Sequence, residues 1–503
     1  MATRTYEEAI TKLNTLQSNF ATLEAARRVG GVNEYAIAET EEYLARIGYS
    51  PSDLNRLNVI HVTGTKGKGS TCAFATSILQ QAKPNWNIGL YTSPHLVAVR
   101  ERIRVNGVPI SEEQFTKYFF EVWDRLEAND KRARPTTPPK PMYFKYLTLV
   151  AFHAFLSLKV DATILEVGVG GLLDCTNVVP KPIVTGVTAL GYDHVAVLGK
   201  TLREIAFQKG GIYKPGVPAF SVPQPPEALE SVKKQAIDRQ ASSFTVTPSL
   251  PALSSLRLGL AGKHQVQNAT LAVYLCHAFL QSVDKNATRP PIEPQLPQDF
   301  VKGLENAKWP GRCQKIKDPK HELITWCLDG AHTTESLTCC AEWYINPEVA
   351  LQDRSATRVL IFNCTNGRTG EEFLSQILAT IHSQLTLLQE DPSAHGVGWF
   401  NHVIFCTNVT YSDGASKGDL HNNTVDHKNL EQLGTQHALA DAWAKLVPEF
   451  NRDHIHVLPS IQHAVELVHI LVTPATPAQV LVTGSLHLVG GVIEAAGLSE
   501  VAL

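Results

Sequence analysis

The sequence predicts an α/β protein of two consecutive domains, the first of which is built on a doubly wound, mostly parallel sheet. Short β-rich runs alternate with helical stretches along the chain, which is the pattern of such sheets. The alternation stops at a proline-rich stretch, residues 290–297, and at the turn of residues 309–312, and then starts again. We therefore expect an N-terminal domain at residues 1–308 and a C-terminal domain at residues 309–503.

The secondary structure expected in each domain follows from hydrophobic runs and from the residues that interrupt them. Residues 135–141 carry several prolines and predict a surface loop, because proline lacks an N–H and fixes φ. The polar stretches 389–401 and 412–428 also predict loops. Strands are expected at residues 57–62, 87–92, 161–167, 183–190, 217–222, 322–328, 358–363, 401–406, 454–458 and 479–483, and helices at residues 70–81, 111–126, 143–158, 201–208 and 268–280.

Composition excludes several classes of protein. Of 503 residues, 44% are hydrophobic and 18% charged, and the formal net charge of −3 gives no reason to expect nucleic acid or an anionic membrane as partner. No apolar run reaches the roughly 18–20 residues of a membrane span. Nine dispersed cysteines without a Cys-x-x-Cys pair favour a reducing compartment. Glu7 and Glu8 lie where a secretory signal would be apolar, so we expect a cytoplasmic protein.

The most informative motif is HVTGTKGKGST, which spans His61 to Thr71 between a predicted strand and a predicted helix. Glycines at such a junction let backbone N–H groups approach a phosphate, and the helix dipole favours its negative charge. Lys68 would reach the β- and γ-phosphates. Because only two residues separate Gly64 from Gly67, the spacing differs from GxxxxGK[ST], and a plain tight turn is the competing interpretation.

Three polar residues follow other predicted strands and would meet at the same edge of the sheet. Glu166 ends an apolar strand, where a buried carboxylate needs a cation to offset its charge. Ser93 and His194 could complete an oxygen and nitrogen set for Mg²⁺ together with water and phosphate. Taken singly, each has a simpler interpretation: a Ser-Pro turn, a salt-bridged glutamate and a helix-capping histidine.

A glycine-rich segment follows Glu166 and contains Asp174 and Asn177. Its glycines suggest close approach to a ligand, although they would also serve a plain loop. Farther along the chain, Lys209 stands at the end of a predicted helix, where a lysine ordinarily complements the helix dipole. Residue chemistry alone assigns Lys209 nothing more.

Eight motifs in chain order resemble those of the folylpolyglutamate synthases, which belong with the Mur ligases. They read GTKGKGST, SPHL, EVGVGG followed by DCTN, DH, KGGI, QNA, PGR and DGAH. The resemblance covers about residues 63–334 and continues weakly through residues 362–363 and 482–489. The form GTKGKGSTCAF resembles the eukaryotic branch. Members of this family have an N-terminal P-loop ATPase domain and a C-terminal Rossmann-like α/β ligase domain.

The resemblance implies a role for each matching residue. Ser93, Glu166 and His194 match magnesium ligands, and Lys209 matches a lysine that is carbamylated in related ligases and then helps to bind a second metal. Lys68, Lys209, Arg312 and His332 would be catalytic. The nucleotide contacts would be Gly67, Lys68, Gly69, Ser70, Asn268, Arg312 and Asp329, and the folate contacts would be Phe144, Lys145, Leu172, Leu173 and Asp174, within segments 143–146 and 172–174.

Three departures from the family pattern are visible. Bacterial relatives often carry arginine where Leu172 stands, so the pterin contact can differ. Residues 366–370 replace the usual Arg-Asp-Pro, which leaves the role of Arg368 open. His332 is followed by Thr333, where asparagine is common.

The implied reaction is ATP-dependent ligation of L-glutamate to the γ-carboxylate of a tetrahydrofolate polyglutamate through an acyl phosphate. The implied cofactors are ATP and Mg²⁺, with K⁺ as a candidate monovalent cation. Folate, glutamate and ATP would be the partners of a monomeric, cytoplasmic protein, with the mitochondrial matrix as a second location. A dihydrofolate synthase, or an enzyme with both activities, is the nearest alternative. An ATP-binding regulatory module without catalysis is an alternative of another class.

Overall fold

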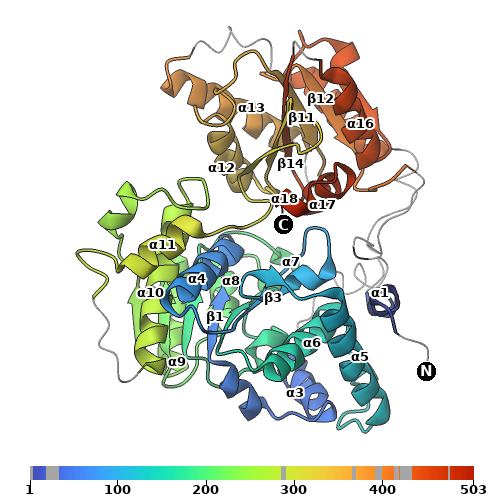
Figure 1. The fold of residues 1–503 in the computed structure, drawn as a ribbon. Coiled ribbons are helices and arrows are strands. Elements are labelled where there is room, and N and C mark those ends of the chain that lie inside the picture. The colour runs from blue at the N-terminus through green and yellow to red at the C-terminus, as the bar shows by residue number, and fades with distance from the viewer. Residues whose placement is uncertain are drawn as a thin grey trace. The chain divides into compact units, whose positions relative to one another are not determined.

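The structure, a computed structural model, describes residues 4–17, 33–284, 291–364, 370–390, 399–412, 419, 433–473 and 476–502. It divides into two compact units. Unit 1 comprises Met1–His95, Val99–Gly259 and Gln265–Lys308, and unit 2 comprises Leu96–Ala98, Leu260–His264 and Trp309–Leu503. In Figure 1, each unit contains a sheet with helices packed around it.

The sheet of unit 1 has eight strands in the order β4-β3-β2-β5-β1-β6-β7-β8. All neighbouring pairs are parallel except β2–β3 and β3–β4. The mostly parallel α/β fold predicted for this half of the chain is thus confirmed. The strands are β1 (Val59–Thr63), β2 (Ile88–Tyr91), β3 (Ile103–Val105), β4 (Val108–Pro109), β5 (Ala162–Glu166), β6 (Val184–Val187), β7 (Pro218–Ser221) and β8 (Ser243–Val246).

Helices connect the parallel strands of unit 1, as a parallel sheet requires. Several begin where the sequence supplies a cap: Ser111 and Thr201 each accept a hydrogen bond from the backbone three residues later. The helices are α1 (Tyr6–Asn14), α3 (Ala36–Arg46), α4 (Lys68–Ala82), α5 (Glu112–Ala128), α6 (Tyr143–Leu158), α7 (Val195–Leu198), α8 (Leu202–Gly210), α9 (Pro226–Asp238), α10 (Gln265–Val283) and α11 (Gln298–Asn306).

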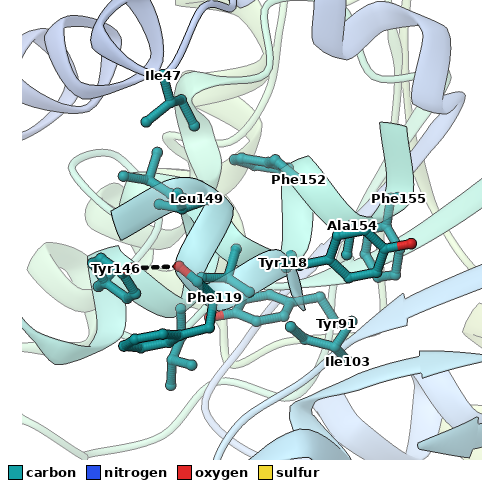
Figure 2. Packing of buried hydrophobic residues seen from close by; sticks show 14 of the residues in the cluster. Ile47, Tyr91, Ile103, Tyr118, Phe119, Tyr146, Leu149, Phe152, Ala154 and Phe155 are labelled. Atoms are coloured by element: carbon teal, nitrogen blue, oxygen red, sulfur yellow. Dashed lines mark hydrogen bonds between the residues drawn. The ribbon is translucent and has the colours of Figure 1, made fainter. Parts of the chain in front are cut away.

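Two helix groups cover this sheet. On one side α10 and α11 pack against α4, so that segments about 200 residues apart in sequence lie side by side (Figure 1). Elsewhere α5 and α6 enclose an aromatic cluster (Figure 2), where the Tyr146 hydroxyl donates a hydrogen bond of 2.9 Å to the Phe119 carbonyl. Burial of these rings supplies much of the hydrophobic stabilisation of the unit. The cluster includes Tyr91 of β2 and Leu165 of β5, so it packs directly against the sheet.

The sheet of unit 2 has six strands in the order β13-β12-β11-β14-β10-β9, and only the β9–β10 pair is antiparallel. This order, with β14 inserted beside β11, is that of a doubly wound fold. Its strands are β9 (Gln314–Lys317), β10 (Ile324–Leu328), β11 (Thr357–Phe362), β12 (His402–Cys406), β13 (Ile455–Leu458) and β14 (Ala478–Thr483), and its helices are α12 (Thr334–Tyr344), α13 (Gly370–Leu387), α15 (Gly434–Leu446), α16 (Ile461–Leu471), α17 (Leu486–Ala495) and α18 (Ser499–Ala502).

The structure adds features that the sequence did not indicate. Leu96–Ala98 belongs to unit 2, because Leu96 and Val97 join its core and the Leu96 carbonyl lies where a side chain on Gly490 would project. The antiparallel strands β3, β4 and β9 were not predicted. Most of the predicted loops at 389–401 and 412–428, together with Arg368, lie outside the described residues. Across the described ranges, no helix is long and apolar enough to span a membrane.

Candidate active site

The predicted phosphate loop lies between the end of β1 and the start of α4, in the middle of the unit 1 sheet. Gly67 precedes α4 with φ of +88°, a conformation that glycine adopts without strain. A Cβ atom on Gly67 would lie 2.1 Å from Oδ1 of Asn268. The loop therefore depends on glycine here, and its backbone approaches α10 closely. Lys68, Gly69 and Ser70 form the first turn of α4, where backbone N–H groups can bind an anion.

Two lysine side chains converge on one carbonyl of this loop. Nζ of Lys68 donates to the Gly64 carbonyl at 3.1 Å, and Nζ of Lys209 donates to the same oxygen at 2.7 Å. Lys209 is 3% exposed, and burial lowers the pKa of its amine well below the usual value, with Lys68 as the next largest cause. Two amines this close repel each other while both are charged, so the site favours an anion beside Lys68 and an uncharged Lys209.

The helix ends around the loop form a polar network. Nδ2 of Asn268 donates to Oε1 of Gln265 at 2.9 Å, and Nε2 of Gln265 lies 3.3 Å from Oγ of Ser70. Asn268 is 4% exposed and Gln265 1%. The first turns of α4 and α10 thus hold each other next to the loop, which places Asn268 where a nucleotide contact is predicted.

The predicted metal ligands follow three parallel strands of the unit 1 sheet: Ser93 follows β2, Glu166 ends the neighbouring β5, and His194 follows β6, which β1 separates from β5. Oε2 of Glu166, which is 4% exposed at the end of β5, accepts a hydrogen bond of 3.1 Å from the backbone N–H of Ser93. The structure therefore brings Ser93 and Glu166 together. His194 follows β6, adopts a left-handed backbone with φ of +50° and keeps a half-exposed side chain. Burial of part of the ring, with nearby Lys209 and Lys68, lowers its imidazole pKa, whereas Asp193 acts in the opposite direction.

Asp174 has structural partners of its own in the predicted folate segment. Oδ2 accepts from the Val169 N–H at 3.1 Å, and Oδ1 accepts from the backbone and the hydroxyl of Thr176 at 3.0 and 2.6 Å. The buried carboxylate has a raised pKa, mainly through loss of hydration. Asp174 thus shapes the glycine-rich loop from within, while Leu172 and Leu173 beside it stay partly accessible. Its contact with folate remains a prediction.

Helix α6 supplies the other predicted folate contacts. The ring of Phe144 lies against Gly168, where a Cβ atom would come within 2.4 Å of it, so Phe144 packs on the same loop. Lys145 forms an ion pair of 2.7 Å with Glu39 of α3. A folate carboxylate would have to compete with Glu39 for Lys145.

Three predicted residues belong to unit 2. Asp329 follows β10, and its carboxylate accepts hydrogen bonds from the backbone N–H groups of Cys313 and Ala331 at 2.7 and 2.9 Å. Nη1 of Arg312 lies 2.6 Å from where a Cβ atom on Gly330 would be. Nδ1 of His332 lies 2.9 Å from the Gly330 carbonyl, just before α12. Arg312, Asp329 and His332 therefore gather around the Asp-Gly-Ala-His turn of unit 2.

Sequence reasoning missed several residues that contact this machinery. Thr65 and Asp193 contact the loops that carry Lys68 and His194. Gln265 accepts a hydrogen bond from Asn268. Burial lowers the imidazole pKa of His264 in unit 2, while the nearby Asp329 raises that pKa and Arg312 lowers it. Thr65 and Asp193 stand inside the quoted motifs GTKGKGST and DH, and His264 and Gln265 stand shortly before the motif QNA. Their residue types alone did not distinguish them from polar residues without a role in the site.

Together the fold and this site define a nucleotide-binding α/β enzyme. A Saccharomyces cerevisiae folylpolyglutamate synthase is 43% identical to this chain over 502 residues, which cover 98% of this chain and 87% of the relative. The chain belongs to the folylpolyglutamate synthase family. No family model matches the sequence.

Solved structures of the same name share the fold. A Mycobacterium tuberculosis folylpolyglutamate synthase, complexed with ADP and AMPPCP, has a TM-score of 0.68 at 23% identity and covers 92% of this chain and 95% of its own. The Thermotoga maritima protein has a TM-score of 0.65 at 24% identity, covering 92% and 93%. A complex with AMPPCP and folate has a TM-score of 0.64 at 20% identity, covering 97% and 99%.

Proposed function

We propose that this chain ligates L-glutamate to the γ-carboxylate of the terminal glutamate of a folate, using ATP and releasing ADP and phosphate. Full-length similarity to a relative named for this activity supports the proposal, as do family structures titled with ATP analogues and folate. The observation that carries it is the convergence of Lys68 and the buried Lys209 on the Gly64 carbonyl of the phosphate loop.

The reaction needs positive charge at this loop. A γ-carboxylate oxygen attacks the γ-phosphorus, the bond to the ADP oxygen breaks, and an acyl phosphate forms. The glutamate amine then attacks the acyl carbon, loses a proton and displaces phosphate, leaving the amide. Lys68 offsets the repulsion between carboxylate and polyphosphate, and the first turn of α4 orients the phosphates. The family resemblance makes Arg312 a further predicted nucleotide contact.

The residues present fit a magnesium ion. Among the described residues, no three His, Cys, Asp or Glu side chains are arranged to hold a metal. The proposed set has only two such residues, Glu166 and His194, with the Ser93 hydroxyl, so phosphate and water oxygens would supply the rest, as Mg²⁺ prefers. When bound, the ion would neutralise phosphate charge. A monovalent cation such as K⁺ is a further candidate for binding in this region.

Lys209 fits the carbamylation that the family resemblance implies. Carbon dioxide bonds to an uncharged amine, which loses one proton and becomes a carbamate. Burial favours that uncharged amine. The nitrogen keeps one hydrogen, which can still be donated to the Gly64 carbonyl. A cation thereby becomes a carboxylate-like group that attracts metal.

Two variants should test the metal set. Glu166→Gln and His194→Ala are each expected to raise the Mg²⁺ concentration at half-maximal rate by about tenfold, because each removes one ligand. A magnesium titration of initial rates measures this effect. Glu204→Gln, on the exposed N-terminal turn of α8, is the matched control and should leave the titration unchanged. An unchanged magnesium requirement in both site variants would show that the metal assignment is wrong.

The function itself is tested by ADP release with each substrate omitted in turn. We expect ADP release over many turnovers only when folate and glutamate are both present. No release under any condition would favour the regulatory module, and release without folate and glutamate would indicate an ATPase rather than the proposed ligase. Tetrahydrofolate and dihydropteroate should be compared as acceptors: turnover with dihydropteroate alone would identify a dihydrofolate synthase, and turnover with both would identify a bifunctional enzyme.

The location and assembly of the protein are part of the proposal. We infer a cytoplasmic monomer with the mitochondrial matrix as a second location, on the basis of the dispersed cysteines and the family resemblance. All nine cysteines are free thiols in the structure. Cell fractionation and light scattering of the purified chain test the two parts.

A further inference from the structure

Thr65 joins two loops at the carboxyl edge of the unit 1 sheet. Its hydroxyl donates to the Gly191 carbonyl at 3.1 Å and accepts from the Gly191 N–H at 3.1 Å. One loop is the phosphate loop after β1. The other follows β6, the parallel neighbour of β1, and leads to His194.

The hydroxyl of Thr65 is already committed to these bonds. A threonine hydroxyl has one hydrogen to donate, and Gly191 receives it. The residue is also 8% exposed. Thr65 is therefore suited to holding the second loop rather than to binding a phosphate or a metal directly.

Packing gives Gly191 little other support. A Cβ atom built on Gly191 would meet nothing within 4 Å, and the next residue, Tyr192, is 60% exposed. The backbone N–H groups of Thr65 and Lys66 both donate to Ala189, but Ala189 lies five residues before His194. Thr65 thus holds the chain at Gly191, two residues closer to His194 than Ala189.

The segment after Gly191 needs that support. His194 has φ of +50°, a strained conformation for a residue with a side chain, and its N–H donates to Oδ1 of Asp193 at 2.9 Å. Oδ2 of Asp193 pairs with Nζ of Lys66 at 3.4 Å, and both side chains are partly exposed. Such a pair contributes little by itself. The two hydrogen bonds of Thr65 to Gly191 join the same two loops through a side chain that is largely shielded from solvent.

We propose that Thr65 is a positioning residue that couples metal binding at His194 to nucleotide binding at the phosphate loop. A nucleotide that orders the phosphate loop would fix Gly191 through Thr65, and so the approach to His194. Linkage requires the reverse as well: a metal at His194 would raise nucleotide affinity by the same factor. The inference rests on the proposed function, specifically on His194 as a metal ligand.

Hydrogen exchange tests the connection without any metal or activity. Thr65→Val removes the hydroxyl at nearly constant size, Thr65→Ala removes it without branching, and Thr65→Ser retains it. The Gly191 amide should exchange about tenfold faster in the valine and alanine variants than in the native chain or the serine variant. Melting temperatures and the exchange of β5 amides establish that the fold is retained. Equal Gly191 exchange in all four proteins would overturn the inference.

Calorimetric titration with ADP, in EDTA and in saturating Mg²⁺, tests the coupling. In EDTA, the ADP dissociation constants of Thr65→Val and Thr65→Ala should lie within about twofold of the native value. The factor by which Mg²⁺ raises ADP affinity should be about tenfold smaller in these two variants than in the native chain. Thr65→Ser should keep the enhancement. Equal losses with and without Mg²⁺ would indicate damage to the phosphate loop alone and would contradict the coupling.

His194→Ala separates this inference from the proposed function. If Mg²⁺ still raises the ADP affinity of His194→Ala, the metal assignment is wrong and the proposed coupling is wrong as well. If His194→Ala loses the enhancement while Thr65→Val and Thr65→Ala keep it, the metal site stands and only the role of Thr65 is refuted.

Discussion

Replacing Lys209 by alanine is expected to lower the rate of glutamate addition by roughly 10²–10³-fold, the usual effect of removing one charge-stabilising group from such a site. The side chain is 3% exposed and donates to the Gly64 carbonyl at 2.7 Å, so alanine also removes the closer of the two lysine donors to that oxygen. If the native residue is a carbamate, acetate or another short carboxylate should partly restore activity. Lys209→Arg should resist rescue, because its guanidinium stays charged and fills the space.

Lys214 provides the matched control for Lys209. It is a partly buried lysine that also donates to a backbone carbonyl, that of Asn177 at 2.8 Å, and burial lowers its amine pKa to about 8. Lys214→Ala should lose some stability but show no dependence on acetate. Initial rates with and without acetate, and removal and return of bicarbonate in the native enzyme, measure the effect. A bare ammonium at Lys209 in a high-resolution map of fully active crystals would contradict carbamylation.

Lys68→Ala is expected to abolish measurable turnover while leaving the chain folded. Lys68 lies in the partly accessible first turn of α4. Its amine donates to the Gly64 and Thr65 carbonyls at 3.1 and 3.5 Å, bonds worth about 1 kcal/mol or less to stability. The larger cost falls on the transition state, which loses its nearest fixed cation. The variant should also hold more protonated Lys209, because Lys68 is one cause of the lowered Lys209 pKa.

Thermal melting and steady-state rates together test the role of Lys68. Lys83, at the other end of α4, pairs with Asp284 at 2.5 Å and serves as control, since Lys83→Ala removes a cation far along the same helix. We expect Lys83→Ala to retain turnover. Near-native turnover in Lys68→Ala with unchanged melting would remove the phosphate role from this lysine.

Much of the fold was predictable because the local signals agree with each other. The helix expected at residues 143–158 is observed as Tyr143–Leu158, and the strand expected at residues 161–167 is Ala162–Glu166. Alternating runs and prolines mark such elements strongly. The hairpin of β3 and β4 was missed although Asn106-Gly107 is a typical hairpin turn, because strands of three and two residues carry almost no periodicity.

Contacts between distant segments could not be predicted from patterns. Lys209 reaches Gly64 across 145 positions, and nothing in the sequence around Lys209 distinguishes it from a lysine that ends a helix. Strand-end geometry did predict that Ser93 and Glu166 would meet, since carboxyl ends of parallel strands share one edge. The local sequence did not indicate that both Asp174 oxygens accept hydrogen bonds from the backbone, and its contact with folate, which the family resemblance implies, stays a prediction.

Unit 2 is built from three separate segments of the chain, which limits where the polypeptide can be divided. A fragment beginning at Trp309 would contain every strand of the second sheet but would lack Leu96–Ala98 and Leu260–His264. Leu96 would then be missing from its place against Gly311 and Gly490, and apolar core surface would meet water. Expression of the second half alone is therefore a poor route to a soluble module. A split version of the protein needs its break inside one unit, at a surface connection away from Leu96–Ala98 and Leu260–His264.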